Sequence, residues 1–190
     1  MKHDKSYLRK KFLLKRKNNY LTQEKFNFDL IFKLIKKKFK NNKIIIGGYY
    51  PSNYEVNILN FLYLASKKNF KIVLPVVKSS TSMLFKPWAI QDPLFVSKFG
   101  ILEPENIKKK DITPDLVMVP LVAFDMKLNR IGYGKGYYDR KLKKFKKKKK
   151  HIISLGIASS FQKYKNIPIN KHDFKLDYIF TERGIINSHK

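Results

Sequence analysis

The segment richest in chemistry is Arg130-Ile-Gly-Tyr-Gly-Lys-Gly-Tyr-Tyr-Asp-Arg140, where glycines alternate with a tyrosine and a lysine. Glycine has no Cβ, so the backbone N–H groups of Gly132, Gly134 and Gly136 can approach a ligand closely and adopt positive φ. Lys135 adds a mobile positive charge, and a helix can begin at the two tyrosines that follow. Backbone donors, a cation and a helix N-terminus together predict a phosphate-binding loop.

Acidic side chains accompany this loop. Asp139 follows the tyrosines directly, and Mg²⁺ takes few protein ligands while keeping several waters, so a carboxylate here suits a magnesium–nucleotide complex. Asp173, in the pair His172-Asp173, could share that metal if the fold brings the two acids together. The alternative for Asp173 is an exposed loop acid. Glu55 also has a structural alternative, a first-turn acid that complements a helix dipole.

The glycine spacing excludes two common nucleotide motifs. No Gly-Lys pair is followed by Ser or Thr as in a P-loop, and the spacing differs from the dinucleotide-binding fingerprint. A tight strand-to-helix turn is the remaining alternative, but three charges, Arg130, Lys135 and Asp139, cluster in it. The four histidines are scattered and form no pair at zinc-binding spacing. The pattern therefore favours a nucleotide site over a zinc site.

Length and composition indicate a single globular domain over residues 1–190. Apolar residues make up 43% of the chain, and the absence of cysteine excludes disulfides and fits a reducing compartment. No apolar segment follows the charged N-terminus, which argues against a signal peptide. The longest apolar run, 116–124, is too short to span a bilayer as a helix. We expect a cytoplasmic protein without membrane partners, and a monomer because no long exposed apolar stripe is evident.

The formal charge of +28 raises a different possibility, a binding protein that uses its lysine-rich face on RNA. Only five of the 42 basic residues are arginine, whereas dedicated nucleic-acid surfaces use arginine heavily for bidentate contacts. The lysines come in runs such as 36–38, 108–110 and 146–150, in a chain also rich in Asn, Ile, Phe and Tyr. We interpret most of them as solvated surface and expect no specific nucleic-acid partner.

Alternating strands and helices predict an α/β fold: one three-layer domain with a mostly parallel central sheet and helices on both faces. In such sheets ligands bind beyond the carboxyl ends of strands, where the glycine-rich loop and the loop leading to Glu55 both lie. In the first helix, Leu8 and Phe12 with the stem of Lys15 form one side, and Lys5 and Arg9 share a face. Residues 89–114 are expected to be mostly loop. The second predicted helix begins after Thr22 as its N-cap, has Glu24 in its first turn and ends at Phe39. The other predicted helices are 4–17, 55–68 and 137–146, and the predicted strands are 43–49, 71–77, 82–88, 115–120, 151–157 and 176–180.

With these residues laid out, the chain resembles the 5-formyltetrahydrofolate cyclo-ligase family from about residue 5 to 182. The most specific block is Pro120-Leu-Val-Ala-Phe-Asp125 followed by the segment 130–140. Weaker blocks occur in the same order and spacing as in the family: Lys5-x-x-Leu8-Arg9, Tyr50-Pro51-x-x-x-Glu55-Val56, Gly100-Ile101-x-Glu103-Pro104, and Pro168-x-x-x-His172-Asp173-x-x-x-Asp177.

The resemblance implies ATP- and Mg²⁺-dependent conversion of 5-formyltetrahydrofolate to 5,10-methenyltetrahydrofolate, with ADP and phosphate released. It implies that Lys135 and Arg130 are catalytic, that Asp139 and Asp173 serve Mg²⁺, and that the reduced folate is the partner. The folate site would be lined by Tyr50, Glu55, Tyr133 and Tyr137. The implied ATP-binding residues are Lys5, Arg9, Arg130, Ile131, Gly132, Tyr133, Gly134, Lys135, Gly136, Tyr137 and Tyr138.

Two positions depart from the family pattern. Ile58 stands where a threonine is common, and Leu121 stands where a glycine is common. Neither departure removes a charged group. Two alternatives to the cyclo-ligase stay open at this point: a non-catalytic RNA- or nucleotide-binding protein on the same fold, and a family member whose substrate has changed.

Overall fold

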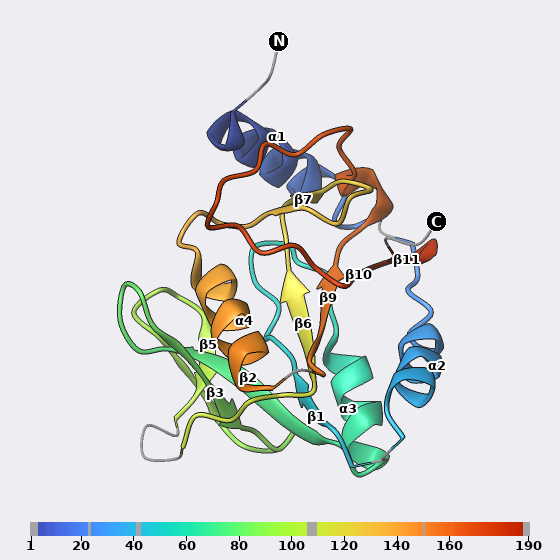
Figure 1. The fold of residues 1–190 in the computed structure, drawn as a ribbon, viewed down its shortest axis with the longest axis vertical. Helices are drawn as coiled ribbons and strands as arrows, with labels where there is room; N and C mark the ends of the chain where they lie inside the picture. Colours follow the sequence, from blue (N-terminus) through green and yellow to red (C-terminus); the bar gives the residue numbers. More distant parts are fainter. Residues whose placement is uncertain (1–3, 23, 41–42, 106–109, 150, 188–190) are drawn as a thin grey trace.

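The protein is described by a computed structural model that covers residues 4–22, 24–40, 43–105, 110–149 and 151–187. The chain forms a seven-stranded sheet with the order β11-β10-β9-β6-β1-β2-β3 (Figure 1). Its strands are β1 (Ile45–Gly47), β2 (Lys71–Val77), β3 (Met83–Pro87), β6 (Leu116–Pro120), β9 (Ile153–Ile157), β10 (Tyr178–Thr181) and β11 (Gly184–Asn187). The inner strands β2, β1, β6, β9 and β10 run parallel, while β3 and β11 pair antiparallel at the two edges.

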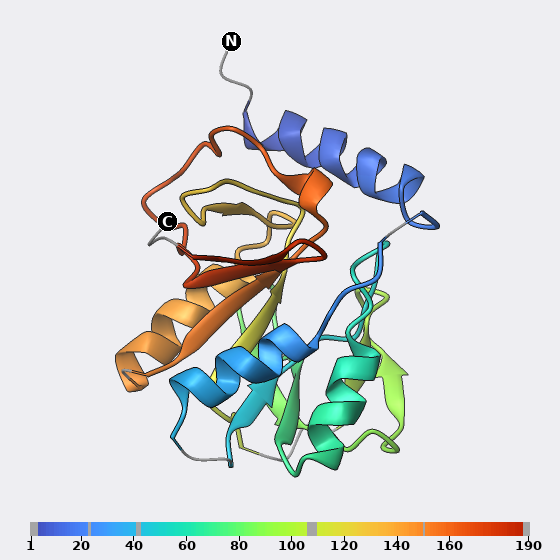
Figure 2. The same ribbon diagram turned by 90° about the vertical axis from the view of Figure 1, so that its right-hand side faces the viewer.

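Helices cover both faces of this sheet, which confirms the predicted three-layer α/β architecture (Figure 2). Side chains alternate between the faces of a strand. In β6, Leu116 and Met118 join the core under two helices on one face, and Val117 and Val119 join the core under a third helix on the other. The helices on the first face are α2 (Asp29–Lys38) and α3 (Leu59–Lys67), and the helix on the second is α4 (Tyr137–Lys148). Because α2 begins at Asp29, the predicted N-cap at Thr22 is wrong.

The first helix, α1 (Lys5–Asn18), lies across the carboxyl end of the sheet (Figure 1). Leu8 and Phe12 are buried against a small hairpin made of β7 (Ala123–Phe124) and β8 (Arg130–Ile131). The face that begins with these two residues continues with Arg16, which is buried, whereas Lys15 is exposed. The expected role of the Lys15 stem is therefore wrong. No described helix is long and apolar enough to cross a membrane.

The segment 89–114 contains structure that was not predicted. β4 (Leu94–Val96) and β5 (Leu102–Pro104) form an antiparallel hairpin beside β2. The Glu103 carboxylate accepts a hydrogen bond from the Val77 amide at 3.2 Å and so attaches this hairpin to the sheet. The rest of the described part of 89–114 has no regular secondary structure, so the expectation of mostly loop is confirmed. The two short strands were not predicted because they owe their pairing to non-local contacts. A short 3₁₀ turn, Ser160–Gln162, completes the described elements.

The helix predicted from Glu55 begins at Leu59 instead. Asn53 and Tyr54 both have positive φ, 47° and 61°, which an α-helix excludes. The side chain of Asn57 accepts a hydrogen bond from the Leu59 amide at 2.9 Å, which satisfies one of the free N–H groups of the first turn. Glu55 therefore lies in a loop, and the interpretation of Glu55 as a first-turn acid is wrong.

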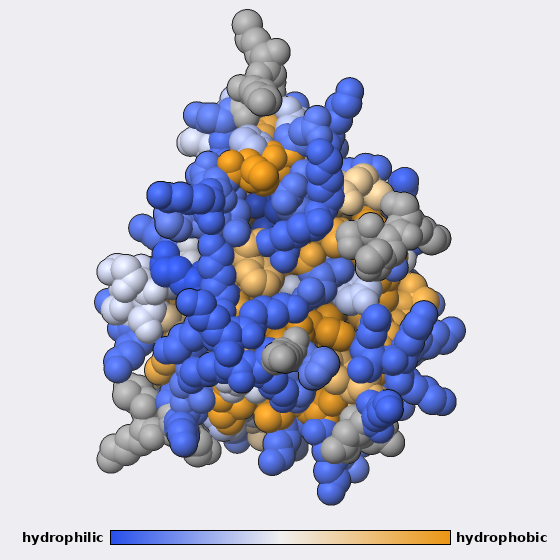
Figure 3. Space-filling view, viewed as in Figure 1, coloured by the Kyte–Doolittle hydropathy of each residue, from blue (hydrophilic) through white to orange (hydrophobic). Residues whose placement is uncertain are grey.

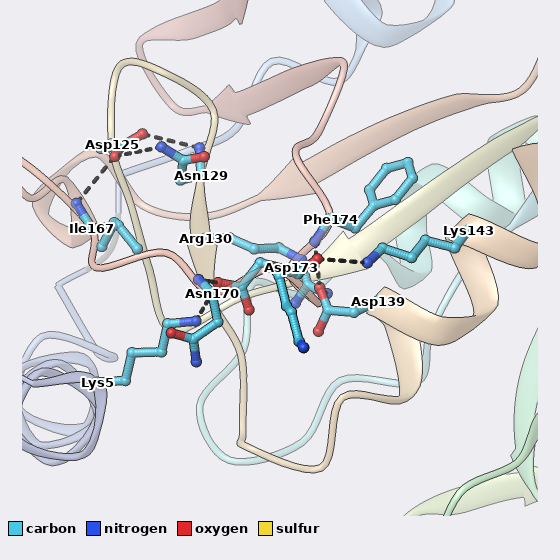
Figure 4. A network of polar contacts seen from close by, with 11 residues as sticks. Lys5, Asp125, Asn129, Arg130, Asp139, Lys143, Ile167, Asn170, Asp173 and Phe174 are labelled. Atoms are coloured by element: carbon cyan, nitrogen blue, oxygen red, sulfur yellow. Dashed lines mark hydrogen bonds and ion pairs between the residues drawn. The ribbon is translucent and has the colours of Figure 1, made fainter.

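The β7–β8 hairpin depends on one buried acid, Asp125. Its carboxylate accepts hydrogen bonds from the backbone of Lys127, Asn129 and Ile167 and from the Asn129 side chain, at 2.9 to 3.1 Å. Figure 4 shows this acid between the hairpin turn and the segment that carries Ile167. The hairpin positions Arg130 at the start of the glycine-rich loop, so Asp125 supports that loop from behind.

We expect Asp125→Ala to destabilise the fold by about 3 kcal/mol, because four donors lose a buried charged acceptor. For a chain of this size the midpoint of thermal unfolding should fall by roughly 6–12 °C. Asp92→Ala is the matched control, since exposed Asp92 accepts a single local bond from Ala89. A thermal midpoint for Asp125→Ala equal to that of the control would contradict the role assigned to Asp125.

Candidate active site

A cavity of about 440 Å³ lies beyond the carboxyl ends of β1 and β6. β1 connects through α3 to β2 on one side, and β6 connects through α4 to β9 on the other. The strand order therefore reverses between β1 and β6, and open α/β sheets bind ligands at such a point. Every residue that the sequence singled out for ATP, folate or metal lines this cavity. The structure thus brings these residues together, while the role of each stays a prediction.

The glycine-rich loop is surrounded by guanidinium groups. Gly134 and Gly136 have φ of +98° and +65°, but Gly132 does not have the expected positive φ. A Cβ at Gly134 would lie 3.3 Å from Arg9 Cζ, and a Cβ at Gly132 or Gly136 would lie 2.9 Å from an arginine nitrogen. The absence of side chains therefore allows cations to lie directly against the loop.

Hydrogen bonds fix two of these cations. Arg9 Nε donates to the carbonyl of Gly132 at 2.8 Å, which leaves its two terminal nitrogens without a partner among the described residues. Arg140 Nη2 donates to the carbonyl of Lys135 at 2.8 Å, and its Nε donates to Thr81. The Lys135 side chain is exposed and its ammonium makes no hydrogen bond or ion pair with any described residue. These free donors suit an anionic ligand with several oxygens.

The two acids predicted to hold metal both face the cavity and both contact cations (Figure 4). Asp139 Oδ1 accepts from Arg130 Nη2 at 2.9 Å and from the Phe174 amide at 3.1 Å. Asp173 Oδ2 pairs with Lys5 and accepts from the Asn170 amide. The second oxygen of each carboxylate has no partner among the described residues.

The described residues contain no cluster of three or more acids, histidines or cysteines suited to a metal. Mg²⁺ does not require one, because it commonly uses one or two carboxylates together with waters and phosphate oxygens. Two cavity-facing carboxylates with one free oxygen each fit a magnesium ion that arrives with a nucleotide. The chemistry of the donor set is therefore compatible with the predicted metal.

Glu55 is a buried carboxylate in the same cavity, with only 5% of its surface exposed. Its Oε1 accepts from the Tyr133 hydroxyl at 2.6 Å, and its Oε2 accepts from the Ser52 amide at 2.9 Å. Burial raises the pKa of Glu55, while the hydrogen bonds from Tyr133 and Ser52 and the charge of Arg16 oppose that rise. The result is a fixed acceptor for paired N–H donors of a ligand.

Four tyrosines complete the lining of the cavity. Tyr49 donates to the carbonyl of Val56 at 2.8 Å, and Tyr137 donates to the carbonyl of Ser79 at 3.1 Å. The Tyr138 hydroxyl is buried without a hydrogen-bond partner among the described residues, and burial together with the charge of Glu55 raises its pKa. Tyr50 is half-buried at the cavity wall. Aromatic faces and few fixed polar groups are typical of a pocket for a flat heterocycle.

Sequence reasoning missed Arg16, Arg140 and Ser52 as site residues. Arg140 is the last residue of the glycine-rich segment, but no role was assigned to it. Ser52 contacts Glu55 through its backbone amide, a contact that no residue type reveals. Arg16 donates to Tyr133 at 2.5 Å and could have been found, because it follows Leu8 and Phe12 at a spacing of four. The two departures from the family pattern, Ile58 and Leu121, are both buried in the core and leave the charged groups in place.

Comparisons with known proteins agree with the motifs. Residues 1–182 match the model of the 5-formyltetrahydrofolate cyclo-ligase family. The 5-formyltetrahydrofolate cyclo-ligase of Mycoplasma pneumoniae is 32% identical over 186 residues, covering 94% of this chain and 99% of that protein. The enzyme of the same name from Haemophilus influenzae is 31% identical over 137 residues, covering 69% of this chain and 72% of that protein.

Solved structures give the same result. The 5,10-methenyltetrahydrofolate synthetase of Aquifex aeolicus superposes with a TM-score of 0.71 at 28% identity, covering 98% of this chain and 93% of that one. The corresponding Mycoplasma pneumoniae structure gives a TM-score of 0.66 at 27% identity, covering 95% and 99%. The resemblance identified from the glycine-rich block is confirmed, and the chain belongs to the 5-formyltetrahydrofolate cyclo-ligase family.

Proposed function

We propose that this protein uses ATP and Mg²⁺ to convert 5-formyltetrahydrofolate to 5,10-methenyltetrahydrofolate. The observation that carries the proposal is one cavity that combines a buried carboxylate, Glu55, with a loop of glycines ringed by arginines and an unpaired Lys135. A reaction between a heterocycle and a nucleotide needs both ligands in contact. The related proteins from Mycoplasma pneumoniae and Haemophilus influenzae are named 5-formyltetrahydrofolate cyclo-ligases, and that name includes the proposed substrate.

The proposed reaction has two steps. The terminal phosphoryl group of ATP passes to the oxygen of the formyl group on N5, with ADP as the leaving group. N10 then attacks the activated formyl carbon and loses its proton, and the C–O bond to phosphate breaks to give the methenyl product. The protein needs no covalent intermediate, because phosphoryl transfer depends chiefly on positioning and on neutralising charge.

The cations are assigned to the nucleotide. Lys5 and Arg9 would reach phosphate oxygens from α1, and Arg130 would do so from the glycine-rich loop. Lys135 would follow the transferred phosphoryl group, since its long side chain is exposed and unpaired. Asp139 and Asp173 would hold Mg²⁺, which when bound neutralises phosphate charge and orients the oxygens.

The folate is assigned to the tyrosine-lined part of the cavity. Glu55 would accept paired hydrogen bonds from the amino-substituted edge of the pterin ring. Tyr133, held by its bond to Glu55, would pack beside that ring, with Tyr50 and Tyr137 as further aromatic walls. In this arrangement the formyl group would lie near the glycine-rich loop assigned to the phosphates.

A spectrophotometric assay tests the proposed function. Purified protein is mixed with 5-formyltetrahydrofolate, ATP and Mg²⁺, and the near-ultraviolet absorbance of the methenyl product is followed. We expect a signal that requires both ATP and Mg²⁺. Folded protein that produces no methenyl product under these conditions would contradict the proposal and favour a family member with a changed substrate.

The lysine-rich surface gives a separate prediction. Hydrophilic side chains cover most of the face that carries α4 (Figure 3), and only five of the 42 basic residues of the chain are arginine. We expect RNA binding to be weak and to weaken steeply as salt rises from about 50 to 200 mM, as counterion release requires. Tight, salt-resistant and sequence-selective binding in a filter or fluorescence titration would contradict this. The cytoplasmic location and the monomeric state expected from the sequence stay predictions.

A further inference from the structure

Arg16 is a buried arginine that belongs to no predicted site. It lies on α1 and is 1% exposed. Its Nη1 donates to the carbonyl of Leu121 at 3.3 Å, and its Nη2 donates to the Tyr133 hydroxyl at 2.5 Å and to the carbonyl of Asn53. The guanidinium carbon also lies 5.5 Å from the centroid of the Tyr133 ring. One side chain thus joins three segments that are distant in the sequence.

Burying the Arg16 guanidinium costs free energy unless neighbouring groups compensate its charge. A buried charge needs a partner, yet Arg16 forms no ion pair with a described carboxylate, and its Nε has no hydrogen-bond partner. The acid that compensates it is Glu55, which it reaches through the Tyr133 hydroxyl. The series Arg16, Tyr133, Glu55 is therefore one connected polar network that ends at the cavity.

The presence of arginine at position 16 is informative because arginine is rare in this lysine-rich chain. Only five arginines occur among 42 basic residues, and four of them, Arg9, Arg16, Arg130 and Arg140, lie at or directly behind this cavity. A guanidinium offers several donors in a rigid plane, whereas lysine offers a point charge. Arg16 uses that plane to bind three acceptors at once, which a lysine cannot reproduce.

Arg16 also contacts a strained loop. Asn53 and Tyr54 have consecutive positive φ angles, and such backbone persists only where its surroundings fix it. The bond from Arg16 to the Asn53 carbonyl is one such constraint. Immediately next to it, the Ser52 amide donates to Glu55 Oε2 and the Glu55 amide donates to the Ser52 carbonyl.

We infer that Arg16 is a positioning residue for the reduced-folate substrate, holding Tyr133 and the 52–55 loop so that the Glu55 carboxylate faces the ligand. The inference deepens the proposed function and rests on it. Arg16 does not itself line the cavity and acts through Glu55 and Tyr133. Its loss should therefore weaken folate binding while leaving ATP binding largely unchanged.

The test measures the KM for 5-formyltetrahydrofolate and the KM for ATP in the parent, Arg16→Lys and Lys17→Met. Lys17 is the exposed neighbour on α1 and serves as the matched control. We expect Arg16→Lys to raise the folate KM at least tenfold and to change the ATP KM by less than twofold. Equal rises in both constants, or a folate KM within twofold of the parent, would overturn the inference. If Arg16→Lys does not fold, Arg16→Gln, which keeps a planar amide donor, replaces it and should show the same folate-specific rise.

A second measurement separates this inference from the proposed function. Hydrogen exchange at the amides of Ser52 and Glu55 needs no substrate. Exchange at both amides should accelerate at least tenfold in Arg16→Lys and stay unchanged in Lys17→Met. If the parent does not turn over 5-formyltetrahydrofolate, the proposed function fails, and unchanged exchange in Arg16→Lys then overturns the positioning role independently.

Discussion

Lys135→Ala is expected to reduce turnover at least about 1,000-fold while leaving the fold intact. A cation that neutralises charge on a transferring phosphoryl group contributes roughly 4 kcal/mol to transition-state stabilisation, which corresponds to that factor. Stability should change by less than about 0.5 kcal/mol, because the side chain is exposed and its ammonium has no described partner. Steady-state turnover with saturating ATP and folate, together with a thermal melt, measures both quantities.

Lys127→Ala is the control for this experiment. Lys127 is exposed in the turn of the β7–β8 hairpin, which leads into the glycine-rich loop, and only its backbone amide contacts Asp125. The control should therefore keep parental turnover. If Lys135→Ala converts 5-formyltetrahydrofolate as fast as Lys127→Ala, Lys135 does not serve the phosphoryl group.

Glu55→Gln is expected to lower kcat/KM for the folate about 100-fold. The substitution keeps the shape of the side chain but replaces a charged acceptor by a neutral amide, at a cost of about 3 kcal/mol when the ligand's donors lose their charged partner. The KM for ATP should be nearly unchanged. An exposed-acid control, Glu24→Gln, should behave as the parent, and a Glu55→Gln variant with parental kcat/KM would show that Glu55 does not bind the substrate.

The pH dependence gives an additional test of Glu55. Burial raises its pKa, so the carboxylate is protonated at a pH above the value of about 4.3 at which an exposed glutamate titrates. In the parent, kcat/KM for the folate should fall as the pH decreases through this raised pKa, and Glu55→Gln should lack that limb. The pH dependence of folding stability has the opposite sign. The native state binds the proton more tightly than the unfolded state, so Glu55 lowers stability as pH rises through the same range.

The sheet and the glycine-rich loop were predictable because their signals are local. The short, β-branched apolar run at 116–120 indicated a buried strand, and three glycines before a helix start indicated a loop for an anion. The acids and cations around that loop were found by residue type alone. The structure then showed that they share one cavity.

The remaining features depend on contacts between distant residues. The hairpin β7–β8 has strands of two residues each and exists because Asp125 binds backbone as far away as Ile167. The sequence predicts a helix from Glu55 because apolar residues at helical spacing follow it. The hydrogen bonds between Glu55 and Ser52 hold Glu55 in a loop instead. Arg16 could not be distinguished from the other cations of a basic helix, because its hydrogen-bond partners, Asn53, Leu121 and Tyr133, are distant in the sequence.

The central claim is that the formyl oxygen accepts the phosphoryl group of ATP in this cavity. Isotopic labelling of that oxygen tests it most directly. 5-Formyltetrahydrofolate carrying ¹⁸O in its formyl group is converted with ATP and Mg²⁺, and the released phosphate is analysed by mass spectrometry. We expect the label to appear in the phosphate. Unlabelled phosphate, with the ¹⁸O released to water, would contradict phosphorylation of the formyl oxygen.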